Sequence, residues 1–251
     1  MSVLKMQNVS VTLGGKDVLD DISLHVAKGE FVSILGPSGA GKSTIFRLLT
    51  GAAQHDSGSI TCNGQPLATN QHGFGFMPQR DALMPWRRII DNLTLGLEVQ
   101  GIRRKDARAR VMPLLADFGL DGFTDHYPAQ LSGGMRQRAA LLRTIAQNRP
   151  VQLLDEPFGA LDALTRTQMQ AWFEKRWRTA RWTTLLVTHD VREAVALSDR
   201  IYVLSRRPAR VIAEVHAPAP RPRLGRPVSA EAHTLEAQLL EILLNQTGET
   251  L

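Results

Sequence analysis

One feature constrains this chain more than any other, the glycine-rich stretch Gly36-Pro37-Ser38-Gly39-Ala40-Gly41-Lys42-Ser43. It follows an almost continuous apolar run, Phe31–Leu35, and precedes a segment of helical character, Thr44–Thr50. A short apolar run of this kind predicts a strand buried on both faces, as in a parallel sheet. Glycines between such a strand and a helix let successive N–H groups converge on an anion. The expected fold is therefore an α/β protein with a phosphate-binding loop.

The residue types in this loop suit nucleotide phosphates in particular. The start of a helix at Thr44 adds partial positive charge where the phosphates would lie. Lys42 is expected to reach the β- and γ-phosphates, and the Ser43 hydroxyl is expected to bind Mg²⁺. A plain glycine turn is the alternative, but the strand before the loop and the helix after it disfavour that interpretation.

A pair of acids, Asp155 and Glu156, follows a second apolar segment, Val151–Leu154. Ligands of parallel sheets bind at the carboxyl ends of the strands, so these side chains are expected beside the phosphate loop. Asp155 is then placed to hold Mg²⁺ through water, and Glu156 to orient or deprotonate an attacking water. Gln152 inside this strand needs a partner, because a buried amide without one is costly. The loop and the two acids together predict ATP hydrolysis.

The patterns elsewhere in the chain divide it into strands and a helical insertion. Alternating apolar residues near 9–13 and 22–26 predict half-buried antiparallel strands. Helical patterns dominate from about 89 to 146, with one helix expected over 104–118 and another over 132–146, for which Ser132 is the expected N-cap. Strand patterns return at 151–154, 184–188 and 201–204. The order predicts an α/β core with a mostly helical insertion.

The composition changes near residue 217. The proline- and arginine-rich segment 217–223 predicts an extended linker, and 229–245 predicts an amphipathic helix that packs back on the body. The net charge of +6 comes partly from basic clusters at 103–110 and 206–226. Such clusters can bind nucleic acid or an anionic membrane surface. No aromatic residues interleave with them, so we expect a solvated basic face and no nucleic-acid partner.

The most specific motif is Leu131-Ser132-Gly133-Gly134-Met135, in which a serine and two glycines open a helix. With this motif the chain resembles the ATP-binding cassette (ABC) ATPases over almost its whole length. The resemblance implies a P-loop NTPase fold, with a RecA-like core, an antiparallel β subdomain and an inserted α-helical subdomain. It also implies an ATPase domain at 1–216, with the helical subdomain at about 89–146, followed by the linker and C-terminal helix at 217–251.

The resemblance assigns roles to further residues. In this family two cassettes pair head to tail, so that Ser132, Gly133 and Gly134 would complete the ATP site on the partner's phosphate loop. Gln79 matches the glutamine that touches Mg²⁺ and senses the membrane subunit. The remaining matches are Asp162, the aspartate that crosses the dimer interface, and His189, the histidine that contacts the γ-phosphate. Leu13 stands where an aromatic residue usually stacks on adenine, which predicts weaker or less selective base contact.

Three further segments resemble the importers of nitrate, sulfonates, taurine and related solutes, namely Leu83–Arg88, Pro157–Thr165 and Arg206–Ile212. Within the first of them, Trp86 is either a permease-facing residue or a partly buried core residue. The implied assembly is a homodimer on an integral membrane permease, supplied by an extracytoplasmic solute-binding protein. An exporter ATPase and a non-transport ABC ATPase remain the alternatives.

Two negative features predict where the protein works. No apolar run approaches the length of about 20 residues that crosses a bilayer, and the N-terminus lacks the apolar core of a secretory signal. Cys62 is the only cysteine, which fits a reducing compartment. We therefore expect a peripheral protein on the cytoplasmic face of the inner membrane.

Overall fold

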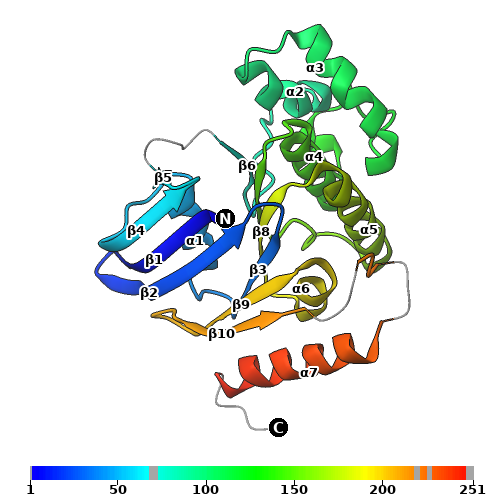
Figure 1. Cartoon of the computed structure of the whole chain (residues 1–251). Coiled ribbons are helices and arrows are strands. Elements are labelled where there is room, and N and C mark those ends of the chain that lie inside the picture. Colours follow the sequence, from blue (N-terminus) through cyan, green and yellow to red (C-terminus); the bar gives the residue numbers. More distant parts are fainter. Residues whose placement is uncertain (1, 68–72, 218–220, 225–227, 247–251) are drawn as a thin grey trace.

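Two β-sheets and the helices around them form the fold (Figure 1). The computed structural model describes residues 2–67, 73–217, 221–224 and 228–246. Its larger sheet has the strand order β10-β9-β3-β8-β7-β6. The strands are β3 (Phe31–Leu35), β6 (Phe74–Met77), β7 (Val151–Asp155), β8 (Thr183–Thr188), β9 (Arg200–Leu204) and β10 (Val211–His216). All neighbours in this sheet pair in parallel except β10, which runs antiparallel to β9.

The smaller sheet is antiparallel, as the alternating pattern near the N-terminus predicts. Its strand order is β2-β1-β4-β5, and the strands are β1 (Ser2–Leu13), β2 (Lys16–Ala27), β4 (Ser57–Cys62) and β5 (Gln65–Pro66). Val9 and Val11 point into the core, whereas their neighbours on β1 are more exposed. By contrast, every residue of β3 and β7 is buried, which confirms the prediction for strands covered on both faces.

Helices cover both faces of the larger sheet. They are α1 (Lys42–Leu49), α2 (Ile89–Val99), α3 (Arg104–Val111), α4 (Gly133–Ala146), α5 (Ala163–Ala180), α6 (Val191–Leu197) and α7 (Ala230–Asn245). Short 3₁₀ turns lie at η2 (Met112–Leu114), η3 (Ala116–Phe118) and η4 (Pro128–Gln130). Among the described residues, no helix combines the length and the apolar character needed to cross a bilayer.

The single helix expected over 104–118 is wrong. The α-helix ends at Val111, and two 3₁₀ turns continue the chain to Phe118. Pro113 explains the break, because its ring lacks an N–H group and clashes with the carbonyl one turn earlier. Gly119 then reverses the chain at φ 57°. The apolar spacing persists across the break, and Val111, Leu115 and Phe118 all remain buried.

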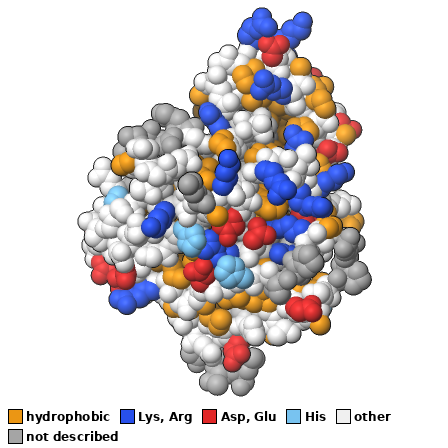
Figure 2. Space-filling view, viewed as in Figure 1, with side chains coloured by type: hydrophobic (Ala, Val, Ile, Leu, Met, Phe, Trp, Pro, Cys, Tyr) orange, Lys and Arg blue, Asp and Glu red, His pale blue; other side chains and the backbone are white. Residues whose placement is uncertain are grey.

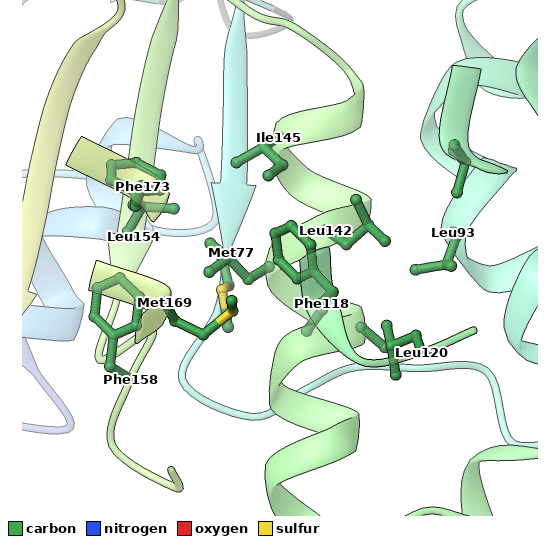
Figure 3. Close-up of a cluster of buried hydrophobic side chains, with 14 of the residues drawn as sticks. Met77, Leu93, Phe118, Leu120, Leu142, Ile145, Leu154, Phe158, Met169 and Phe173 are labelled. Carbon is green, nitrogen blue, oxygen red and sulfur yellow. The ribbon is translucent and has the colours of Figure 1, made fainter. Parts of the chain in front are cut away.

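Three apolar clusters hold these layers together. The first joins α2, α4 and α5 to the sheet, and its members include Leu93 on α2 and Phe173 on α5 (Figure 3). The second fills the space between the two sheets and includes Ile45 and Phe46 of α1. The third lies under α6 and α7. The helices of 89–146 are therefore packed into a core that is continuous with the sheet.

The C-terminal helix packs against the body, as the sequence predicts. Helix α7 begins at Ser229, whose side chain accepts a hydrogen bond from Ala232 N, and it buries Leu235 and Leu239. Of the segment 217–223, residues 218–220 lie outside the described residues. The expectation of a solvated basic face is wrong for Arg221 and Arg223, whose side chains are 11% and 10% exposed.

Arg221 is instead an internal residue. Its guanidinium lies 4.4 Å from the ring centroid of Trp177 and donates to Glu174 Oε1 at 3.3 Å and Asp199 Oδ1 at 3.0 Å. The Arg223 side chain bonds the carbonyls of Val195 and Ser198. On the face drawn in Figure 2, basic side chains are interspersed with acidic and apolar ones.

Candidate nucleotide-binding site

The carboxyl ends of adjacent parallel strands bring the expected functional residues to one edge of the larger sheet. The glycine-rich loop leaves β3, and Asp155 ends β7 with Glu156 directly after it. His189 follows β8, and Gln79 follows β6. Because the strand register fixes these ends relative to one another, residues far apart in the sequence share one site.

The phosphate loop requires glycine at Gly41. This residue has φ 113°, and a Cβ atom there would lie 3.0 Å from both Val18 Cγ1 and Leu19 Cδ2. The loop then opens α1 with Lys42, whose ammonium donates to the carbonyls of Gly36 at 2.8 Å and Pro37 at 2.9 Å. Burial lowers the pKa of Lys42, while Glu156 and Asp155 act in the opposite direction. The loop thus presents a buried cation beside the N-terminus of a helix.

A cavity of about 230 Å³ lies against this loop. Its walls come from the loop and from three other elements of the same edge. The lining residues are Ser38, Gly39, Gly41, Lys42, Ser43, Thr44, Gln79, Glu156 and Arg207. Loop, amide, carboxylate and guanidinium groups therefore surround one space.

Glu156 connects this cavity to His189. Its side chain accepts a hydrogen bond from Gln79 Nε2 at 3.2 Å, and its other oxygen lies 3.1 Å from His189 Nδ1. The backbone of Glu156 has φ 49°, a left-handed conformation that is uncommon for residues other than glycine. Gln137 on α4 supports this backbone by donating to the Glu156 carbonyl at 3.0 Å. A small cavity of about 40 Å³ borders both Glu156 and His189.

Asp155 is buried behind the loop with only 3% of its surface exposed. Burial raises the pKa of Asp155 to about 6, and a hydrogen bond from Ser43 opposes that rise. Among the described residues, no hydrogen-bond donor reaches its Oδ1 atom. A buried, unsatisfied carboxylate oxygen whose side chain bonds a serine hydroxyl matches the hard oxygen ligands that Mg²⁺ prefers. The residues present therefore fit a magnesium ion.

The other expected residues lie outside both cavities. Ser132 caps α4 by accepting from Met135 N at 3.2 Å, and Gly133 and Gly134 form the first turn. Asp162 caps α5 by accepting from Thr165 N at 3.0 Å, and this bond lowers the pKa of Asp162. Neither these residues nor Leu13 is among the described residues that line the two cavities. Leu13 instead packs at the edge of the second apolar cluster.

Trp86 does not belong to the core. Its side chain is 73% exposed, so the alternative of a partly buried core residue is wrong. The segment that carries it is nevertheless anchored, because Asn92 on α2 bonds the backbone of Met84 in both directions and also bonds the carbonyl of Arg87. A large apolar ring is thus displayed by a fixed loop.

Sequence reasoning missed a buried carboxylate behind His189. Glu193 on α6 accepts from the Thr188 hydroxyl and from Gln170 Nε2 on α5 at 3.4 Å. Burial raises the pKa of Glu193 to about 7. Arg166 on α5 pairs with Asp190, which is next to His189, at 3.7 Å. The signal in the sequence that could have revealed this carboxylate is the glutamate itself, four residues after His189 on the buried face of a short helix.

The buried amide of Gln152 is half satisfied, because its Oε1 atom has no hydrogen-bond partner among the described residues. Its Nε2 atom donates to the carbonyl of Arg149 at 2.7 Å. The opposite residue on β6 is Gly75, where a Cβ atom would lie 2.5 Å from Gln152 Oε1. The polar side chain therefore occupies space that a glycine leaves open.

The site combines a glycine loop that opens a helix, a buried lysine, and two acids at the end of β7, two strands away from β3 in the sheet. This combination defines the class of the protein, the P-loop ATPases. Comparison with known proteins identifies the family within this class. The family model for ABC transporters matches residues 19–159. The chain belongs to the ABC transporter family, as one of its nucleotide-binding ATPases.

Similar proteins share both sequence and fold. The aliphatic sulfonates import ATP-binding protein SsuB of Cupriavidus pinatubonensis is 43% identical over 98% of this chain and 79% of its own length. The formylaminopyrimidine import ATP-binding protein ThiZ of Halalkalibacterium halodurans is 44% identical over 80% of this chain and 78% of its own. The dimeric post-hydrolysis structure of the cassette MJ0796 with ADP and Pi superposes with a TM-score of 0.78, covering 86% of this chain and 99% of that one at 29% identity.

Proposed function

We propose that this chain is the ATP-hydrolysing subunit of an importer, and that it drives uptake of a small solute through a membrane permease. The observation that carries the ATPase part is the single cavity that joins the phosphate loop to Gln79 and Glu156, with His189 on the far side of Glu156. The importer part is supported by two similar proteins, which are import ATP-binding proteins for aliphatic sulfonates and for formylaminopyrimidine. The solute is of the nitrate, sulfonate, taurine or pyrimidine type.

The residues of the cavity divide the work of hydrolysis. Loop N–H groups and Lys42 bind the phosphates. Glu156 orients the attacking water and accepts its proton, and His189, in contact with Glu156, faces the γ-phosphate. Ser43, Gln79 and Asp155 would hold Mg²⁺, which when bound neutralises charge on the β- and γ-phosphates.

Two copies complete each site. Ser132, Gly133 and Gly134 open α4 outside the cavity, so within one chain they are free to meet the phosphates of another copy. Asp162 would cross the same interface. This proposal is supported by the similar cassette MJ0796, whose structure with ADP and Pi is dimeric. Closure of the dimer then depends on ATP, because the contacts between the two copies form only when both copies bind the same triphosphate.

We further propose the organisation and setting of the complex. Residues 1–216 form the ATPase domain, with the helical subdomain at about 89–146, and 217–251 form the linker and C-terminal helix. The exposed ring of Trp86 docks against the permease. The dimer sits on the cytoplasmic face of the inner membrane, and an extracytoplasmic solute-binding protein delivers the solute.

Substitution Glu156→Gln tests the ATPase assignment. Glutamine keeps the size and the hydrogen bond from Gln79 but cannot accept the proton, so turnover should fall by about 10²-fold or more while MgATP binding is retained. The measurements are steady-state phosphate release and equilibrium binding of MgATP. The variant should also accumulate as an ATP-dependent dimer by light scattering. Full ATPase activity in Glu156→Gln would remove Glu156 from the mechanism.

Uptake tests the importer assignment separately. The chain is reconstituted in vesicles with the permease and binding protein encoded beside it, and labelled alkanesulfonate, taurine, nitrate and formylaminopyrimidine are supplied outside. ATP-dependent accumulation of one of them inside the vesicles is expected. Movement in the opposite direction would replace the importer with an exporter and leave the ATPase assignment intact.

A further inference from the structure

Strand β9 is the remaining parallel strand of the larger sheet, and the residue that follows it in the cavity, Arg207, has no role in the proposed hydrolysis. It lies next to β3, the strand that leads into the phosphate loop. The chain leaves it through the turn Ser205–Arg210, which contains the arginines Arg206, Arg207 and Arg210. At Gly36 a Cβ atom would lie 3.2 Å from Leu204, so the end of β9 closely approaches the start of the phosphate loop.

Backbone and side-chain bonds fix this turn in place. Ala209 is fully buried, donates to the carbonyl of Val18 at 3.0 Å and accepts from Asp20 N at 2.9 Å. Arg210 pairs with Asp20 at 2.5 Å, and the Ser205 hydroxyl accepts from Arg210 N at 2.9 Å. Val18 also borders Gly41 of the loop. The same stretch of β2 therefore supports both the phosphate loop and the turn.

The turn directs Arg207 to the phosphate cavity. Arg207 is one of the lining residues, together with Lys42 and Glu156. Within the described residues Arg207 takes part in no ion pair, whereas Arg210 is neutralised by Asp20. Lys42 is the only other cation among the residues that line this cavity. Arg207 thus contributes a positive charge that no described acid neutralises.

We propose that Arg207 is a further phosphate-binding residue, whose guanidinium contacts the phosphate chain of the nucleotide held by the glycine-rich loop. This inference rests on the proposed ATPase function and adds to it a ligand contact from β9. A planar guanidinium can donate two parallel hydrogen bonds to phosphate oxygens, which an ammonium cannot. The other residues that line the cavity are those of the phosphate loop and the start of α1, together with Gln79 and Glu156, and Leu13 is not among them. The contact therefore falls on phosphate rather than on the base.

Paired arginine variants test the proposal. In Arg207→Ala the affinity for MgATP should fall by about tenfold, a value typical of one hydrogen-bonded charge with a partly solvated partner. The matched control is Arg206→Ala, which removes the neighbouring exposed arginine of the same turn and should bind like the wild-type protein. Arg207→Lys keeps the charge without the planar geometry and should lie between the two. Affinities are read by displacement of a fluorescent ATP analogue, after the thermal unfolding of each apo variant has been matched to wild type.

Two results would overturn the proposal. One is an affinity of Arg207→Ala within twofold of wild type, or an equal loss in Arg206→Ala. The other is a loss seen with MgATP but not with MgGTP, which would assign Arg207 to the base. Lys42→Ala separates this inference from the proposed function. If Lys42→Ala abolishes MgATP binding while Arg207→Ala does not weaken it, only the role of Arg207 fails; if neither variant affects binding, the ATPase site itself is misplaced.

Discussion

Glutamine in place of Glu193 should make the protein less sensitive to pH. Glu193 is buried on α6, where Thr188 and Gln170 donate to its two oxygens. Burial, with a smaller contribution from nearby Asp190, raises its pKa from 4.5 to about 7, and Arg166 opposes the rise. A raised carboxyl pKa means that between pH 4.5 and 7 the folded state binds more protons than the unfolded state. The stability contributed by protonated Glu193 is therefore present below pH 4.5 and lost as the pH rises towards 7.

The size of the effect follows from the shift. At 1.36 kcal/mol for each pKa unit, the folded protein loses about 3 kcal/mol through this group between pH 4.5 and 8. Glutamine is neutral at every pH and nearly the same shape. The free energy of unfolding of Glu193→Gln, minus that of wild type, should therefore increase by about 3 kcal/mol across this range. Any constant cost of the substitution cancels in the comparison between two pH values.

Urea titrations at pH 4.5, 6, 7 and 8 measure this difference. The control is Glu241→Gln, which changes an exposed carboxylate on α7 and should follow the wild-type profile. A difference between Glu193→Gln and wild type that stays flat from pH 4.5 to 8 would refute the reasoning. ATPase rates measured on the same variants add a second readout. His189 lies between Thr188, whose hydroxyl accepts from Asp190 N, and Asp190, whose side chain accepts from Glu193 N.

Three further substitutions have expected outcomes. Leu13→Tyr should tighten MgATP binding about fivefold, since a stacked ring contributes on the order of 1 kcal/mol; unchanged or poorer affinity by calorimetric titration counts against contact between position 13 and adenine. Trp86→Ala should reduce transport or permease binding in vesicles far more than ATPase activity of the isolated subunit, and an equal loss of all three would contradict a docking role. Arg221→Ala should lower the free energy of unfolding by about 3 kcal/mol, because it leaves Glu174 buried without its charged partner and uncovers Trp177; a change below 1 kcal/mol in urea would show that the pair adds little.

The sequence predicts the sheet and the loop well because local patterns determine both. Continuous apolar residues at Phe31–Leu35 and alternation near Val9 separate buried parallel strands from half-buried antiparallel ones, and both assignments are confirmed. The glycine-rich loop is predictable for the same reason, since Gly41 is required by its own backbone conformation and by its neighbours. Ser132 is recognisable as a helix cap from its position before two glycines and an apolar helix.

Residues whose role depends on distant partners could not be predicted. Arg221 belongs to a basic cluster in the sequence, yet it is buried because the acids Glu174 and Asp199, on other elements, surround it. Gln137 bonds the backbone of Glu156 across nineteen positions, and no local pattern announces such a contact. The helix expected over 104–118 failed for the opposite reason: its apolar spacing is correct, but Pro113 interrupts the hydrogen bonds that the spacing alone cannot reveal.

The parallel pairing of β6, β7, β8, β3 and β9 has a mechanical consequence. Hydrogen bonds between strands fix the spacing of the strand ends from which the loops at this edge start. Binding of a nucleotide can therefore rearrange the tips of these loops but cannot move their strand ends apart. In the proposed dimer, the distance between the two copies is what can still change. We therefore expect ATP hydrolysis to move whole subunits as rigid bodies, without changing the internal arrangement of the larger sheet.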